Sequence, residues 1–188
     1  MSKFADLHIH THFSDSTDSP EEVVAKAKKE GLCCISITDH DTIDAIIPAR
    51  AAAQNDLEVI TGVELSTEID GKDIHILAYL FDLNSPELLN VLQKAQETRV
   101  KRVGLMIEKL QGLGFKNISV DEVLSLSHSK SVGRPHLAFL LKQKGWVSSI
   151  YEAFNKYLGE NCPAYVPKYK LSPVDAIDVI RKSGGLSV

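Results

Sequence analysis

Histidine and aspartate side chains gather in two short stretches of this chain, at a spacing that suits metal binding. Residues 6–15 read DLHIHTHFSD, and residues 38–40 read TDH. Side chains of a β-strand alternate between its two faces. On a strand, one face would therefore carry Asp6, His8, His10 and His12. Two imidazoles two positions apart can bind one divalent ion, and core packing does not require so many polar rings on one face. The spacing predicts a metal cluster.

Further polar residues fall where the predicted strands end. They are Asp15 in the loop after the first strand, Asp39 and His40 after the second, Glu64 in the third and His75 in the fourth. In a parallel barrel these strand ends converge on one face of the molecule. A mixed set of imidazoles and carboxylates suits zinc, manganese or iron, whereas calcium prefers oxygen ligands alone.

Some of these residues also have a purely structural interpretation. Taken alone, His75 fits a hydrogen-bonded core histidine, and Glu64 fits a surface residue at the end of a strand. Asp6 and His12 fit either metal ligands or groups that orient a ligand imidazole. The joint pattern, with His8 and His10 at its centre, favours the metal cluster.

Strands and helices alternate in the part of the chain that carries these residues. Apolar runs predict strands at 4–11, 32–38, 57–65 and 73–80, with a turn at 70–72. Helices are predicted between them, from a capping box at Ser19–Glu22 to Gly31, and over 42–55. Asp41 and Thr42 are expected to cap the second helix, and Pro48 is expected to kink it. The alternation predicts an α/β fold with a parallel sheet, open or closed into a barrel.

The pattern changes in the second half of the chain. A long helix is expected at 85–113, followed by shorter helices and then an amphipathic helix at 173–183. We predict that residues 97–161 form a helical insertion or cap, between parts 1–96 and 162–188 of the α/β domain. Residues 184–188, GGLSV, read as the entry to another buried strand, so the chain is expected to be truncated.

Composition limits the class of ligand. A net charge of −4 and a pI near 6.0 give no basic surface for duplex nucleic acid, so a nucleotide would be held locally. Three cysteines, two of them adjacent at Cys33 and Cys34, fit buried thiols in a reducing compartment. The sequence shows no secretory signal and no apolar stretch that could span a bilayer. We expect a cytoplasmic protein without membrane contact; its oligomeric state is not indicated.

Four motifs taken together resemble the PHP (polymerase and histidinol phosphatase) superfamily: DLHIHT at 6–11, SD at 14–15, TDHD at 38–41 and GVE at 62–64. VGRPH at 132–136, AYVP at 164–167 and GG at 184–185 resemble its TrpH-like branch, which includes 3′,5′-nucleoside bisphosphate phosphatases. The resemblance covers essentially the whole chain. It implies a distorted (β/α)7 TIM-like PHP barrel with a helical insertion. The barrel would be incomplete here, because the chain ends before the later Ala-His-Pro and Asp-x-His motifs of such proteins.

The resemblance also implies a metal centre of two or three divalent ions, Mn²⁺, Zn²⁺ or Fe²⁺. Carried over by motif position, the ligands are His8, His10, Asp15, His40, Glu64 and His75, with Glu64 bridging two ions.

The segment GRPH at 133–136 combines free backbone N–H groups at a predicted helix start with a guanidinium and an imidazole, a suitable grip for phosphate. The residues alone fit equally a plain helix start with an exposed Arg134. The resemblance favours phosphate contact by Arg134 and His136, with Lys168 as a further substrate-binding cation. Glu64, Arg134 and His136 are the expected catalytic residues, with His136 or a metal-bound water protonating the leaving oxygen.

The expected function is that of a metal-dependent phosphoesterase, a hydrolase in which a metal-bridged hydroxide attacks a phosphomonoester. The expected substrate is a nucleoside 3′,5′-bisphosphate or the 5′ end of a short oligonucleotide. Two alternatives stay open: a histidinol-phosphate-type or broad-specificity phosphatase, and a non-catalytic PHP module or inactive fragment. A nuclease acting on longer nucleic acid has less support, because the lack of a basic face argues against tight binding of a duplex, although it does not argue against exonucleolytic trimming.

Overall fold

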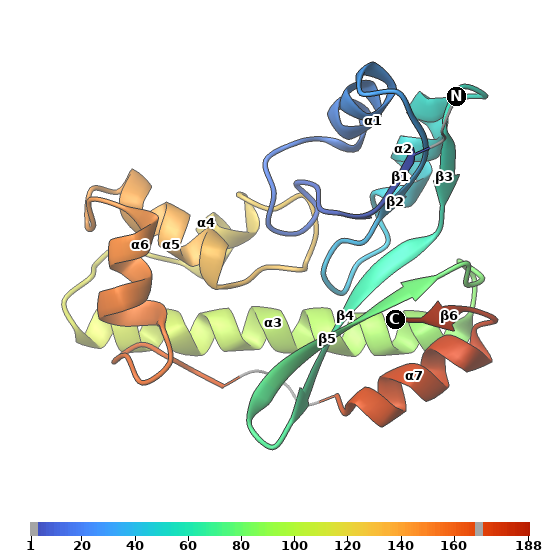
Figure 1. Cartoon of the computed structure of the whole chain (residues 1–188). Helices are drawn as coiled ribbons and strands as arrows, with labels where there is room; N and C mark the ends of the chain where they lie inside the picture. The colour runs from blue at the N-terminus through green and yellow to red at the C-terminus, as the bar shows by residue number, and fades with distance from the viewer. Residues whose placement is uncertain (1–3, 168–170) are drawn as a thin grey trace. The chain divides into compact units, whose positions relative to one another are not determined.

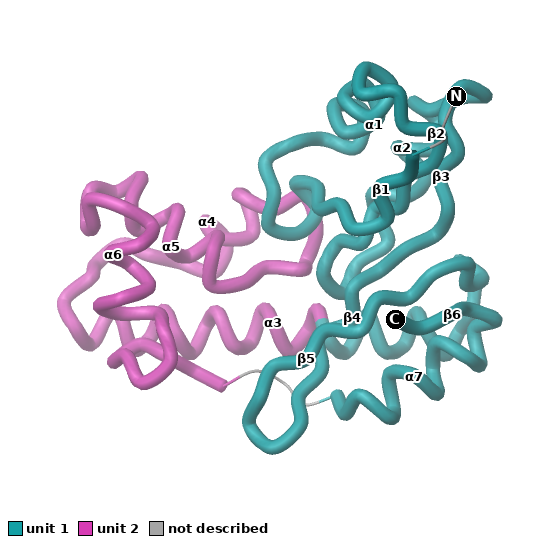
Figure 2. Tube along the Cα trace, in the orientation of Figure 1, with its two compact units in different colours: residues 1–95, 170–188 teal, residues 96–169 magenta. Residues whose placement is uncertain are grey.

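The chain folds into two compact units in a computed structural model, which describes residues 4–167 and 171–188. The first unit comprises Met1–Ala95 and Lys170–Val188, and the second comprises Gln96–Tyr169 (Figure 2). The long helix α3, Pro86–Gly112, begins in the first unit and continues into the second. The fold is a mixed α/β fold. Within the described ranges, no helix has both the length and the apolar character needed to cross a membrane.

A parallel sheet forms the first part of unit one. Its strands are β1 (Phe4–Ile9), β2 (Leu32–Ile37) and β3 (Glu58–Ile60), in the order β1-β2-β3. The connecting helices are α1 (Pro20–Lys29) and α2 (Ile46–Ala53), which lie beside this sheet (Figure 1). Apolar residues of both helices pack with those of the sheet into one core cluster. The predicted capping box of α1 is confirmed, with reciprocal bonds between Ser19 and Glu22.

The region before α2 differs from the sequence prediction. The helix begins at Ile46, so Pro48 lies in its first turn, where its missing N–H has no intrahelical partner to lose. Asp41 and Thr42 do not cap it. Asp41 instead accepts a bond from Ser66 N at 2.8 Å, and Thr42 Oγ1 accepts one from Asp44 N at 3.3 Å.

An antiparallel sheet forms the second part of unit one. The hairpin of β4 (Gly62–Ile69) and β5 (Lys72–Tyr79) turns at Asp70 and Gly71, and β6 (Leu186–Ser187) pairs with β5 (Figure 1). The expected parallel sheet is therefore found only for β1 to β3, and the strand predicted at 57–65 is two strands, β3 and β4. The described strands form two three-stranded sheets, which do not by themselves show a barrel. Buried residues of β4, β5, the start of α3 and α7 (Pro173–Lys182) form a second core cluster.

The two sheets of unit one meet at an isolated parallel bridge between His40 and Glu64. Asp41 N donates to Glu64 O at 3.0 Å, and Glu64 N donates to Asp39 O at 3.3 Å. The bridge places the residues that follow β2 directly beside the start of β4.

Unit two is helical in its described residues. It contains the rest of α3 with α4 (Val120–Leu124), α5 (Arg134–Gln143), α6 (Ile150–Ala153) and a π-helical turn, Phe154–Leu158. Its core is built on fully buried side chains that include Met106, Leu110, Leu137, Leu141 and Leu158.

Gly62 allows β4 to approach β2 closely. A Cβ added at this position would overlap Ser36 Oγ and lie 2.8 Å from the carbonyl oxygen of Ile37, a backbone atom that cannot move aside cheaply. We predict that Gly62→Ala lowers the free energy of unfolding by about 2 kcal/mol or more, as overpacking does in a close-packed core. The measurement is urea unfolding followed by circular dichroism.

The matched control is Gly104→Ala in the middle of α3, where an added Cβ has its nearest neighbour at 3.7 Å. This change should stabilise the helix by about 0.5–1 kcal/mol, because alanine loses less backbone entropy than glycine. An unchanged unfolding midpoint for Gly62→Ala would show that the two strands can separate at no cost.

Candidate metal centre

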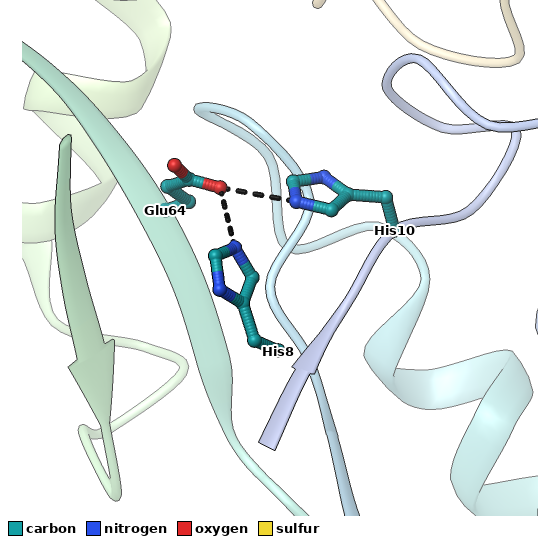
Figure 3. A group of neighbouring side chains, drawn as sticks. All are labelled: His8, His10 and Glu64. Carbon is teal, nitrogen blue, oxygen red and sulfur yellow. Dashed lines mark hydrogen bonds and ion pairs between the residues drawn. The ribbon is translucent and has the colours of Figure 1, made fainter. Parts of the chain in front are cut away.

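Four imidazoles surround the buried carboxylate of Glu64, which is only 4% exposed. Its Oε2 lies 3.1 Å from His8 Nε2 and 3.1 Å from His10 Nε2, and Figure 3 shows both rings directed at this oxygen. The other oxygen, Oε1, lies 2.6 Å from His75 Nδ1. His40 approaches with its Nδ1 3.6 Å from Oε2.

Asp15 extends the cluster on the side away from Glu64. Its carboxylate oxygens lie 3.5 Å from His10 Nδ1 and 3.6 Å from His40 Nε2. The rings lie close together, with centroids 4.7 Å apart for His10 and His40 and 4.9 Å apart for His40 and His75.

These side chains form three adjoining groups whose donor atoms lie within 4.8 Å of one another. The groups are His8 with His10 and Glu64, His10 with Asp15 and His40, and His40 with Glu64 and His75. All the ligands predicted from the sequence are members, and each group combines imidazole with carboxylate, the donor set that zinc, manganese and iron accept. The residues therefore fit the binding of divalent metal ions.

Two residues from the first stretch lie elsewhere. Strand β1 ends at Ile9, so the alternation predicted through His12 stops before it. His12 lies in the following turn, with its backbone N–H bonded to Asp18 O at 2.8 Å and its ring against Phe13. Asp6 is exposed and accepts a bond from His8 N at 3.2 Å. Neither belongs to a candidate group among the described residues.

The structure adds Tyr79 to the surroundings of the cluster. Its hydroxyl donates to Leu7 O at 2.7 Å, which ties β5 to the strand that carries His8. Burial, with the charges of Glu64 and Asp6, raises the pKa of Tyr79. Tyr79 was not among the residues predicted from the sequence, although its position four residues after His75 places both on one face of β5.

The charges of the cluster reinforce one another. Burial alone would raise the pKa of Glu64, but hydrogen bonds from His10 and His75, the charge of His40 and the bond from His8 hold it well below its ordinary value. Burial lowers the pKa of His10, but Glu64 and Asp15 outweigh it, and the net pKa is raised. Glu64 is thus an anion whenever the protein is folded near neutral pH.

The predicted substrate residues belong to the second unit. Arg134 is half-buried at the start of α5, with its guanidinium 5.6 Å from the ring centroids of Phe154 and Tyr165. It is therefore not the exposed arginine of a plain helix start. His136 Nδ1 accepts a bond from Gly133 N at 3.2 Å. Lys168 lies outside the described residues.

Comparison with known proteins identifies a family. The sequence model of the PHP domain family matches residues 6–162 of this chain. A 5′-3′ exoribonuclease of Haemophilus influenzae is 37% identical over 100% of this chain and 68% of its own length. A 3′,5′-nucleoside bisphosphate phosphatase of Chromobacterium violaceum is 29% identical over 97% of this chain and 65% of its own. The chain thus spans about two thirds of these relatives.

A solved structure from Bifidobacterium adolescentis, described as a metal-dependent phosphoesterase, superposes with a TM-score of 0.90. The two sequences are 28% identical, and the match covers 100% of this chain and 66% of the other.

The raised pKa of His10 predicts a pH dependence of the metal-free protein. A folded-state pKa above the ordinary 6.5 stabilises the fold fully below that pH, and this stabilisation is lost as the pH rises through the folded-state value. The melting temperature of chelator-treated protein should therefore fall as the pH rises above 6.5, and His10→Gln should flatten the slope. An identical slope in both proteins would contradict the assignment.

Glu64 is the acceptor common to the imidazoles, so its removal should disable the centre. We predict that Glu64→Gln weakens zinc binding on the order of 100-fold or more, since loss even of a group that only orients a ligand costs 10–100-fold. Competition with a chromophoric chelator measures the affinity. Glu68→Gln, on the same strand but in none of the candidate groups, is the control and should bind zinc as the unaltered protein does.

Proposed function

Because the chain belongs to the PHP domain family, we propose that it is a metal-dependent phosphoesterase that cleaves a phosphomonoester of a nucleotide. The observation that carries the proposal is the convergence of His8, His10, His40 and His75 on the buried carboxylate of Glu64. A buried carboxylate shared by several imidazoles is costly unless it serves a bound cation or their protons.

The residues that would hold the ions are His8, His10, Asp15, His40, Glu64 and His75. Bound Mn²⁺, Zn²⁺ or Fe²⁺ would supply Lewis acidity and a water acidic enough to act near neutral pH. Glu64 lies in two of the three groups and has two carboxylate oxygens, so it would be a ligand common to both groups, the role that the resemblance implies for it. Its lowered pKa keeps it ionised for this role.

The proposed substrate is a nucleoside 3′,5′-bisphosphate or the 5′ end of a short oligonucleotide. The relative from Chromobacterium violaceum is named for phosphatase activity on the bisphosphate, which supports the first form. The relative from Haemophilus influenzae is named a 5′-3′ exoribonuclease, which supports an oligonucleotide bound by its 5′ end, with a phosphodiester bond as the bond cleaved. A net charge of −4 favours a short ligand over duplex nucleic acid.

Arg134 and His136 are proposed to bind phosphate through charge-assisted hydrogen bonds. The flanking rings of Phe154 and Tyr165 restrict the guanidinium, so less side-chain entropy is lost on binding. Because His136 Nδ1 accepts from Gly133 N, the proton of the neutral ring is on Nε2, from which it could pass to a leaving oxygen. Lys168 is proposed as an additional cation.

We further propose that the two sheets of unit one belong to one distorted (β/α)7 barrel, with residues 97–161 inserted between parts 1–96 and 162–188. The parallel bridge between His40 and Glu64 supports a continuous arrangement of the sheets. The free thiols of Cys33, Cys34 and Cys162 support a reducing, cytoplasmic location.

The deciding experiment, with Mn²⁺ added, measures phosphate release from adenosine 3′,5′-bisphosphate and from histidinol phosphate. For a 5′-phosphorylated oligoribonucleotide it measures the release of both phosphate and nucleoside monophosphates. Turnover of either nucleotide substrate that is lost in Glu64→Gln would support the proposal. Preference for histidinol phosphate would favour the alternative phosphatase, and metal binding without any turnover would favour a non-catalytic module.

The same assay tests the phosphate site. Arg134→Ala should lower kcat/KM by about 100-fold, because a guanidinium that stabilises phosphoryl charge contributes a few kcal/mol to the transition state. Arg181→Ala, which removes an exposed arginine paired with Asp178 on α7, should leave turnover unchanged.

A further inference from the structure

The loop that follows β1 closes around a buried carboxylate outside the candidate metal groups. Asp39 is 1% exposed, and its two oxygens accept three hydrogen bonds from this loop. Thr11 donates through its backbone N at 2.6 Å and its hydroxyl at 2.5 Å, and Ser14 donates through its hydroxyl at 2.6 Å. Burying a carboxylate so completely is costly unless it is fully hydrogen-bonded, and the loop supplies those bonds.

Ser14 continues the chain of bonds to a proposed metal ligand. Its Oγ lies 3.3 Å from Nδ1 of His10. A hydroxyl has one hydrogen to donate, and the short bond to Asp39 takes it, so Oγ acts as acceptor towards His10. Asp15 Oδ1 competes weakly at 3.5 Å from both Ser14 Oγ and His10 Nδ1.

The direction of these bonds decides which nitrogen of His10 is available. With the Nδ1 hydrogen donated to Ser14, Nε2 is the nitrogen that faces Oε2 of Glu64 at 3.1 Å. In the metal-free protein Nε2 donates a hydrogen to Glu64, and a bound ion would take the place of that hydrogen. Histidine ligands in metal sites are commonly oriented in this way by a group bonded to the second ring nitrogen.

Asp39 is also connected to the two other backbone segments that carry ligands, those of His40 and Glu64. It immediately precedes His40 in the chain, and its backbone oxygen accepts a bond from Glu64 N at 3.3 Å. A single buried residue therefore joins the loop of His10 and Asp15, the segment of His40 and the strand of Glu64.

We propose that Asp39 and Ser14 are positioning residues of the metal centre, forming a carboxylate–hydroxyl–imidazole relay that makes His10 present Nε2 to the ion. This inference rests on the proposed function, since it assigns a task within the same centre. Thr11 holds the carboxylate in the orientation that the relay requires.

The test uses Ser14→Ala and Asp39→Asn, with Ser85→Ala as the matched control. Ser85 is likewise buried, and its hydroxyl bonds to Ser183 Oγ at 2.9 Å, but it is in none of the candidate metal groups. Zinc affinity is measured by chelator competition, and the protonated ring nitrogen of His10 by ¹⁵N NMR of the zinc-loaded protein, assigned with His10→Gln.

We expect zinc binding about 10–100-fold weaker in Ser14→Ala and Asp39→Asn. The Nδ1 hydrogen of His10 should be observed in the unaltered protein and should exchange faster in Ser14→Ala. Ser85→Ala should lose thermal stability but keep its zinc affinity. If Asp39→Asn fails to fold, Ser14→Ala decides.

Unchanged affinity and an unchanged His10 spectrum in Ser14→Ala would overturn the relay while leaving the proposed function intact. Absence of binding of Zn²⁺, Mn²⁺ and Fe²⁺ alike by the unaltered protein would overturn both. Metal binding by the unaltered protein therefore distinguishes failure of the relay from failure of the proposed function.

Discussion

The buried carboxylate of Glu64, shared by four imidazoles, is the constraint on which the arrangement of unit one depends. The imidazoles come from β1, from the loop after it, from the segment after β2 and from β5. Burying a carboxylate costs free energy unless neighbouring groups, held in fixed positions, pair with its charge and hydrogen-bond to it. Each backbone segment around the cluster is accordingly fixed by bonds of its own.

Three local features fix those segments. Gly62 lets β4 lie against β2, so that Glu64 reaches the end of the parallel sheet. The backbone bridge of His40 with Glu64 sets the register between the sheets. The bonds of Asp39 to Thr11 and Ser14 hold the loop that carries His10 and Asp15. These features use backbone atoms and short polar side chains, which define position more sharply than apolar packing does.

The second unit presents a different kind of chemistry. Its cations are held against carbonyl oxygens and aromatic rings, as Arg102 is by Val166 O and Tyr165, and as Arg134 is by Leu158 O, Phe154 and Tyr165. An arginine restrained in this way keeps its charge, and binding an anion costs it less entropy. This property suits the phosphate contact proposed for Arg134.

The sequence by itself determined the features that arise from local patterns. The capping box of α1 and the strands β1 and β2 were predictable, because capping and alternation act between residues close in the chain. The sequence also showed that His8, His10 and Glu64 have side chains that can bind a metal ion. Tertiary structure alone decided that the strand expected at 57–65 is divided into β3 and β4 and that β4 pairs antiparallel with β5. It also decided that Tyr79 is bonded to Leu7 and that Asp39 binds the loop rather than standing among the ligand groups. These outcomes depend on which distant backbone groups meet, and neither period nor propensity carries that information.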